Sequence, residues 1–83
     1  MDYRRKKLLF QSQHRGMKEN DILLGHFAAE LIETLSEEDL EFFEALLGES
    51  DNDIYNGVTE REPLPEHLDN MFMSALISFN KVK

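Results

Sequence analysis

The chain has 83 residues and no cysteine, which fits one small domain over residues 1–83 and excludes disulfides and thiolate metal sites. Its longest stretch without a charged residue, 70–80, is about half of the ~20 residues that a membrane-spanning helix requires, so we expect no membrane insertion. The net charge of −8 disfavours binding to nucleic acid, because an acidic surface repels phosphates.

The positive charges are concentrated at the N-terminal end. Residues 1–18 carry a net charge of +5, whereas residues 19–80 carry −15. This asymmetry is typical of a terminal arm that meets an anionic surface, but a solubilising end on an acidic bundle explains it equally well. The alternative function of the chain is therefore a helical adaptor that binds nucleic acid or another anionic surface through residues 4–7.

Good helix formers predict a first helix over residues 3–13, with an apolar patch at residues 8–10. Gly16 ends this segment, because glycine suits the left-handed conformation that often follows a helix. A second helix is predicted from about Lys18 to Leu35, where apolar residues recur at helical spacing. Its apolar positions are Leu23, Leu24, Phe27, Ala28, Leu31, Ile32 and Leu35.

The third helix is predicted to begin at Ser36, a helix cap whose partner three residues later is Asp39, and to end at Gly48. A short fourth helix follows, capped by Ser50 or Asp51 and closed by the prolines at 63 and 65.

The last helix is predicted from about Glu66 to Phe79, with Pro65 near its first turn. Its main apolar stripe comprises Leu68, Phe72, Ala75, Leu76 and Phe79, whereas Met71, Met73 and Ile77 point elsewhere. The fold class is therefore all-α, a compact bundle of about five helices.

The residue types that enzymes use are not grouped along the chain. The glycines occur singly and the three histidines are far apart, so we expect neither a phosphate-cradling loop nor a histidine metal site. Residues 51–62 place acids at positions 1, 3 and 12 of a calcium loop, but Asn56 stands where that loop needs glycine. The sequence predicts no catalytic residue, no metal and no enzymatic activity.

The segment from Arg15 to Glu19 has two interpretations. As a structural corner, Gly16 turns the chain, Arg15 lies near the negative end of one helix, and Glu19 and Asp21 lie near the positive end of the next. As a contact surface, it presents a cation, a bare backbone and a carboxylate to another protein.

The run Arg15-Gly16-Met17-Lys18-Glu19, followed by Asp21, resembles the Arg-Gly-x-x-Glu hallmark of assembly factors that promote covalent attachment of FAD to the flavoprotein subunit of succinate dehydrogenase. Asp53-Ile54-Tyr55-Asn56 matches a second segment of that family, and the resemblance covers roughly residues 4–79. One position differs from the family pattern, because Gly57 stands where the family usually has tryptophan. Either the pocket that this tryptophan normally fills is rearranged, or docking uses a different contact there.

The resemblance implies a bundle that binds the flavoprotein subunit of succinate dehydrogenase without itself being the catalyst. In this interpretation Gly16 allows close approach, Arg15 points outward to pair with an acceptor on the partner, and Glu19 orders polar groups near the reacting histidine of that subunit. Further partner-binding residues are Met17, Asp21, Tyr55 and Asn56.

The resemblance also implies no stably bound cofactor, because the FAD is held by the partner. The free chain is expected to be a monomer, and the flavoprotein of fumarate reductase is a second candidate partner. No Arg- and Ser-rich leader precedes the first helix, so we expect a bacterial cytoplasm rather than a mitochondrial matrix.

Overall fold

The computed structural model describes residues 1–82, and the regular elements in this range are all helical. They are α1 (Tyr3–Gln13), α2 (Lys18–Leu31), the 3₁₀ turn η1 (Ile32–Thr34), α3 (Glu37–Leu47), α4 (Asp51–Val58), the 3₁₀ turn η2 (Glu66–Leu68) and α5 (Met71–Lys81). The predicted all-α bundle of about five helices is confirmed. Lys83, which the sequence analysis includes in the domain, lies outside the described residues.

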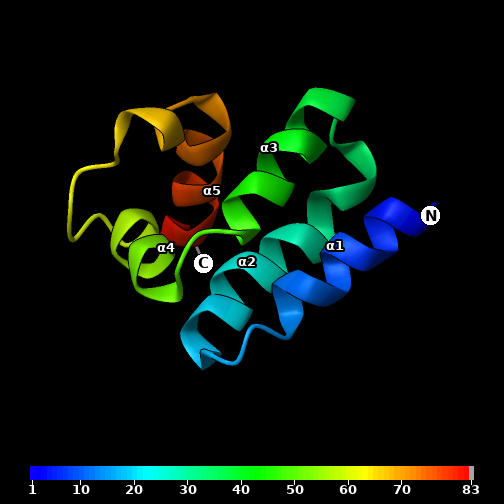
Figure 1. Cartoon of the computed structure of the whole chain (residues 1–83), viewed down its shortest axis with the longest axis horizontal. Coiled ribbons are helices and arrows are strands. Elements are labelled where there is room, and N and C mark those ends of the chain that lie inside the picture. Colours follow the sequence, from blue (N-terminus) through cyan, green and yellow to red (C-terminus); the bar gives the residue numbers. More distant parts are fainter. Residues whose placement is uncertain (83) are drawn as a thin grey trace.

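Helix α2 is the element around which the others are arranged. It packs against α1 on one side and contacts α4 and α5 as well. Figure 1 shows α1 and α2 as a pair of antiparallel helices on one side of the molecule, with α4 and α5 on the other. The corner that joins α1 to α2, residues 14–17, therefore lies at an edge of the bundle.

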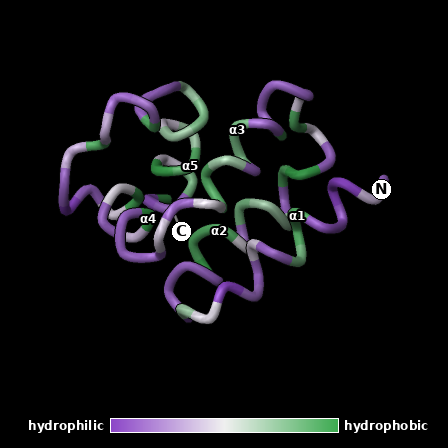
Figure 2. The backbone as a smooth tube through the Cα atoms, in the orientation of Figure 1, coloured by the Kyte–Doolittle hydropathy of each residue, from purple (hydrophilic) through white to green (hydrophobic). Residues whose placement is uncertain are grey.

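The core is centred on the ring of Phe27 in α2. This ring makes edge-to-face contacts with Phe43 of α3 at 6.3 Å and with Phe72 of α5 at 5.4 Å between ring centroids. Figure 2 shows the hydrophobic stretches of α2, α3 and α5 meeting in the interior, while the connecting segments are mostly hydrophilic. The buried apolar residues are Leu8, Leu24, Phe27, Ala28, Ile32, Leu40, Phe43, Leu46, Ile54, Val58, Leu68, Phe72, Met73 and Leu76.

The predicted start of the third helix is confirmed in atomic detail. The hydroxyl of Ser36 accepts a hydrogen bond from the Asp39 backbone N–H at 3.1 Å, and the Asp39 carboxylate accepts one from the Ser36 N–H at 3.4 Å. Of the two candidates for the cap of α4, Ser50 takes the position, because its hydroxyl accepts from the Asp53 N–H at 3.2 Å. The carboxylate of Asp51 is consequently available for contacts outside its own helix.

The predicted start of the last helix at Glu66 is wrong. Residues 66–68 form only the turn η2, and α5 begins at Met71 after Asn70, whose side chain accepts from the Met73 N–H at 3.0 Å. Asparagine is a strong helix cap, so the helix begins after Asn70 and not after Pro65. None of the helices within residues 1–82 combines the length and the apolar character needed to cross a bilayer.

The buried face of α5 is largely the predicted one, because Phe72 and Leu76 are in the core. Met73 is in the core, whereas Ala75, assigned to the main stripe, is exposed and Met71 is 89% exposed. In α1 the predicted apolar patch is divided: Leu8 is buried, Leu9 is half-buried and Phe10 is exposed. Helix α2 ends at Leu31 rather than Leu35, and η1 completes the segment.

Candidate functional site

The corner between α1 and α2 has an open backbone at Gly16. Its φ of +96° is in the region that side chains rarely adopt, which confirms the turn predicted there. A Cβ built on this glycine would have no heavy atom within 4 Å. The backbone of Gly16 is therefore accessible, and a larger side chain at this position would project away from the bundle.

The expectation that Arg15 points outward is wrong. Only 12% of its side chain is exposed, and Nε donates to Oδ1 of Asp51 at 2.6 Å. Nη1 donates to the Leu47 carbonyl at 2.7 Å and Nη2 to the Glu49 carbonyl at 3.0 Å. The last carbonyls of a helix lack partners within the helix, and the planar fork of a guanidinium can satisfy several at once. Arg15 therefore ties the corner to the end of α3 and the start of α4.

Asn20 and Asp51 complete this network, which was not predicted from the sequence. The fully buried Asn20 donates from Nδ2 to the Asp51 backbone carbonyl at 2.9 Å and to Oδ1 at 3.1 Å. The hydrogen bond from Arg15 lowers the pKa of Asp51, the hydrogen bond from Asn20 and the charge of Arg15 add to this effect, and burial opposes it. The available signal was an asparagine on the buried side of an otherwise apolar helical stripe.

The other motif residues of the corner have different environments. Asp21 accepts a hydrogen bond from the Arg15 backbone N–H at 2.6 Å, so its carboxylate helps to shape the turn. Met17 is half-buried, with its sulfur 3.5 Å from Nδ2 of Asn20. Glu19 is exposed, and its carboxylate has no hydrogen bond or ion pair with any described residue. Of the two charged ends of the motif, only this carboxylate is free to meet another molecule.

Tyr55 and Asn56 lie on α4, one turn beyond the network. Tyr55 is four residues after Asp51 and therefore on the same face of that helix. It is half-buried, and the guanidinium of Arg61 lies 5.5 Å from its ring centroid. Asn56 donates to Glu62 at 2.9 Å, which holds the segment after α4. The structure brings the start of α4, through Asp51, into contact with the corner.

At Gly57 the space for a side chain is already occupied. Gly57 is buried, and a Cβ there would lie 2.9 Å from Cδ2 of Leu64. Leu64, from the segment that returns toward α5, thus covers α4 at this position.

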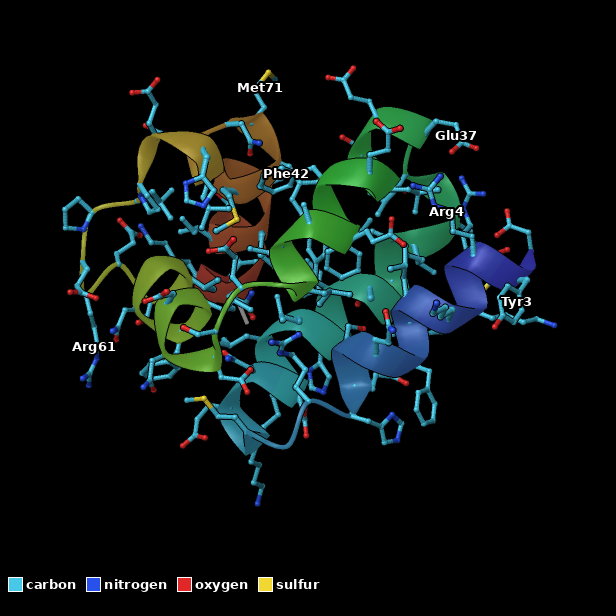
Figure 3. All side chains as sticks on the ribbon, in the orientation of Figure 1. Tyr3, Arg4, Glu37, Phe42, Arg61 and Met71 are labelled. Carbon is cyan, nitrogen blue, oxygen red and sulfur yellow. The ribbon has the colours of Figure 1, made fainter. Side chains whose placement is uncertain are left out.

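The basic N-terminal helix offers fewer free cations than its sequence suggests. Arg4 donates to Glu37 at 2.8 Å, and Figure 3 shows the two side chains together at one end of the bundle. Arg5 bonds to Asp2 and to the backbone carbonyls of residues 32 and 35. Two of the four cations assigned to an anionic surface are thus engaged within the chain, which weakens the adaptor alternative.

No group of three or more His, Cys, Asp or Glu side chains within residues 1–82 is placed to hold a metal ion. The feature with the most chemistry in this range is the corner, with its open backbone, its free carboxylate and the Arg15–Asp51–Asn20 network beneath it. Such an arrangement suits contact with a surface better than conversion of a small substrate.

Comparison with known proteins identifies the corner motif as part of a wider similarity. The family model described as "Flavinator of succinate dehydrogenase" matches residues 6–80. Proteins named "Succinate dehydrogenase assembly factor 2, mitochondrial" are 41% identical over 83 residues in Danio rerio and 46% identical over 65 residues in Dictyostelium discoideum. These matches cover 98% and 78% of this chain, but 52% and 46% of the relatives.

A third relative of the same name, from Saccharomyces cerevisiae (strain ATCC 204508 / S288c), is 42% identical over 69 residues, covering 80% of this chain and 43% of the relative. The chain thus spans about half the length of the relatives it matches.

The expectation of a bacterial cytoplasm is contradicted by these relatives, which are named mitochondrial and come from eukaryotes. It was drawn from the residues that precede the first helix. Because the chain spans only about half the length of these relatives, its first residues say nothing about a leader.

Proposed function

This chain belongs to the family of flavinators of succinate dehydrogenase, and we propose that it binds the flavoprotein subunit of that enzyme and promotes covalent attachment of FAD to it. The observation that carries the proposal is the corner itself. The family motif falls on a turn where Gly16 has positive φ and open space around it, beside the exposed carboxylate of Glu19.

In this proposal the partner approaches the corner along the Gly16 backbone. An absent Cβ permits contact with main-chain atoms, and main-chain contact is sensitive to any side chain placed there. Glu19 then offers a carboxylate to polar groups beside the histidine that becomes bonded to the flavin. Charged groups at such an interface contribute mainly to specificity, while neighbouring apolar residues such as Met17 contribute affinity.

Arg15 has a supporting role in this proposal. Its guanidinium is occupied by Asp51 and by the carbonyls of Leu47 and Glu49, so it holds the corner in shape and makes no contact with the partner. An interface presented by a pre-formed turn loses less entropy on binding than one that must first be ordered.

The reacting groups, a histidine and FAD, both belong to the partner in this proposal. The chain acts as a binding protein that favours the conformation in which they react. Its glycines at positions 16, 25, 48 and 57 occur singly, so the sequence offers no glycine-rich loop to hold a pyrophosphate. The flavoprotein of fumarate reductase is a second candidate partner for the same surface.

The test is covalent flavin content measured by in-gel fluorescence of the flavoprotein subunit. Cells that lack their own assembly factor are supplied with this chain, with its Gly16→Arg variant, or with an empty vector. We expect fluorescence with the wild type and little with the variant, whose fold is checked separately by circular dichroism. Equal fluorescence in all three samples would contradict the proposal.

A further inference from the structure

Helix α1 presents an aromatic surface that packing of the bundle does not explain. Phe10 is 62% exposed, and its ring stacks on that of His14 with centroids 4.0 Å apart and planes inclined by 20°. Tyr3, one heptad before Phe10, is 78% exposed. Residues three, four and seven positions apart share a face of a helix, so Tyr3, Lys6, Lys7, Phe10 and His14 form one outward stripe.

Beside this stripe is a groove that leads to the corner. It has a volume of about 450 Å³ and separates α1 from the end of α3. Its wall nearest the corner includes Arg15, which is already held by its own chain, and Leu47, which is half-buried. The lining residues are Lys7, Phe10, Gln11, His14, Arg15, Glu44, Leu47 and Gly48.

Within the residues that the structure describes, most cations without an ion pair are on the two helices that the corner joins. Among the Lys and Arg residues in the part that the structure describes, Arg4, Arg5, Arg15 and Lys81 have carboxylate partners. Those without an ion pair are Lys6, Lys7, Lys18 and Arg61. Lys6 and Lys7 flank Phe10 on the stripe, and Lys18 follows the corner at the start of α2. Three of the four cations without an ion pair in residues 1–82 are thus on α1 or at the first residue of α2.

We infer that the partner-binding surface extends from the Gly16 corner along the outer stripe of α1, and that it receives an acidic segment of the flavoprotein carrying an apolar side chain. Phe10 is the apolar anchor, and Lys6, Lys7 and Lys18 pair with the carboxylates of that segment. This inference rests on the proposed function, since it names the chemistry of the partner at the same surface.

The lysines and the exposed Phe10 together indicate that a protein segment binds to this surface. Nucleic acid would need a larger cluster of free cations than this surface offers. An exposed phenylalanine gains most by entering a pocket from which water is excluded, as interface anchors do. Lysines around that anchor attract carboxylates and accelerate association.

The experiment compares the affinities of variants for the purified flavoprotein subunit of succinate dehydrogenase. Phe10→Ala should weaken binding about tenfold or more, because truncating an interface anchor commonly has that effect. Met71→Ala is its control: it removes an exposed apolar side chain from α5, outside the surface, and should leave the affinity unchanged. Thermal unfolding of both variants should match the wild type, since each side chain is largely exposed.

A second pair of variants tests the contribution of the lysines to binding. Lys7→Glu is the test, and Lys81→Glu on α5 is a control with the same change of net charge. Lys7→Glu should slow association several-fold at low salt and reduce the dependence of binding on salt, whereas Lys81→Glu should change neither by more than twofold.

The outcomes separate this inference from the proposed function. If the wild type binds and Gly16→Arg does not, while Phe10→Ala and Lys7→Glu bind as the wild type does, the extended surface is wrong and the proposed function stands. If the wild type does not bind the flavoprotein at all, both are overturned. Binding of the wild type to DNA or to anionic vesicles but not to the flavoprotein would also overturn both, in favour of the adaptor alternative.

Discussion

Nε of Arg15 donates to Oδ1 of Asp51 at 2.6 Å, although the two residues are 36 positions apart in the chain. The bond joins the first residue of the family motif to the first residue of α4. It turns an arginine that the sequence assigns to a partner into an internal connection, and leaves Gly16 and Glu19 as the exposed part of the motif.

Removal of the Arg15 side chain should destabilise the fold. Arg15→Ala leaves the Asp51 carboxylate without its cation and two carbonyls without donors, which should lower the free energy of unfolding by about 2–3 kcal/mol. Arg15→Lys should recover part of this loss, because an ammonium keeps the charge but not the planar fork. Urea unfolding gives the values. Lys6→Ala, at an exposed site without an ion pair, should stay within about 0.5 kcal/mol of the wild type.

If Arg15→Ala unfolds at the same urea concentration as Lys6→Ala, the internal network contributes nothing to stability. The arginine would then have to be explained by contact with the partner after all.

Substitution of Gly16 should lower the stability of the chain while leaving the bundle folded. The backbone at this residue is strained for any side chain, so Gly16→Ala should cost about 1–2 kcal/mol, although its Cβ touches nothing. Gly16→Asn should cost less, because asparagine tolerates positive φ better. Both variants should remain folded by circular dichroism. Loss of the fold in Gly16→Ala would mean that the corner is packed more tightly than its open surroundings indicate.

Stability should depend on the ionisation of Asp51 in acid. Because its pKa is lower in the folded chain than in the unfolded one, its contribution is complete above about pH 4 and is lost as the pH falls through the folded value. Urea unfolding between pH 6 and pH 3 should therefore show a smaller loss of stability for Asp51→Asn than for the wild type. Asp53→Asn, which removes an exposed carboxylate from the same helix, should lose stability as the wild type does.

A small side chain at Gly57 should be tolerated. Alanine favours a helix interior over glycine by about 1 kcal/mol, and the atom that its Cβ would meet is the flexible end of Leu64. Gly57→Ala should therefore raise the free energy of unfolding by about 0.5 kcal/mol once Leu64 has shifted. The gain should increase when Leu64→Ala is already present, because the contact is then gone. A net loss in that second background would show that something other than Leu64 limits the space.

Much of the secondary structure follows from short-range pattern. The capping pair of Ser36 and Asp39, the turn at Gly16 and the helical spacing of Leu24, Phe27 and Ala28 each depend on residues within about four positions of one another. The error at α5 is of the same local kind, since it came from preferring Pro65 to Asn70 as the start of the helix. A comparison of Pro65 and Asn70 as possible starts of the helix would have placed it correctly from the sequence.

The sequence by itself determined the helical class, the positions of the caps and turns, and the motif by which the family is recognised. Only the tertiary structure decided which motif residues face outward. Arg15 turns inward because the carbonyls of residues 47 and 49 and the carboxylate of Asp51 arrive beside it when α3 and α4 pack against the corner. A long cationic side chain goes to the best acceptors within its reach, and these come from a part of the chain that no local pattern connects to it.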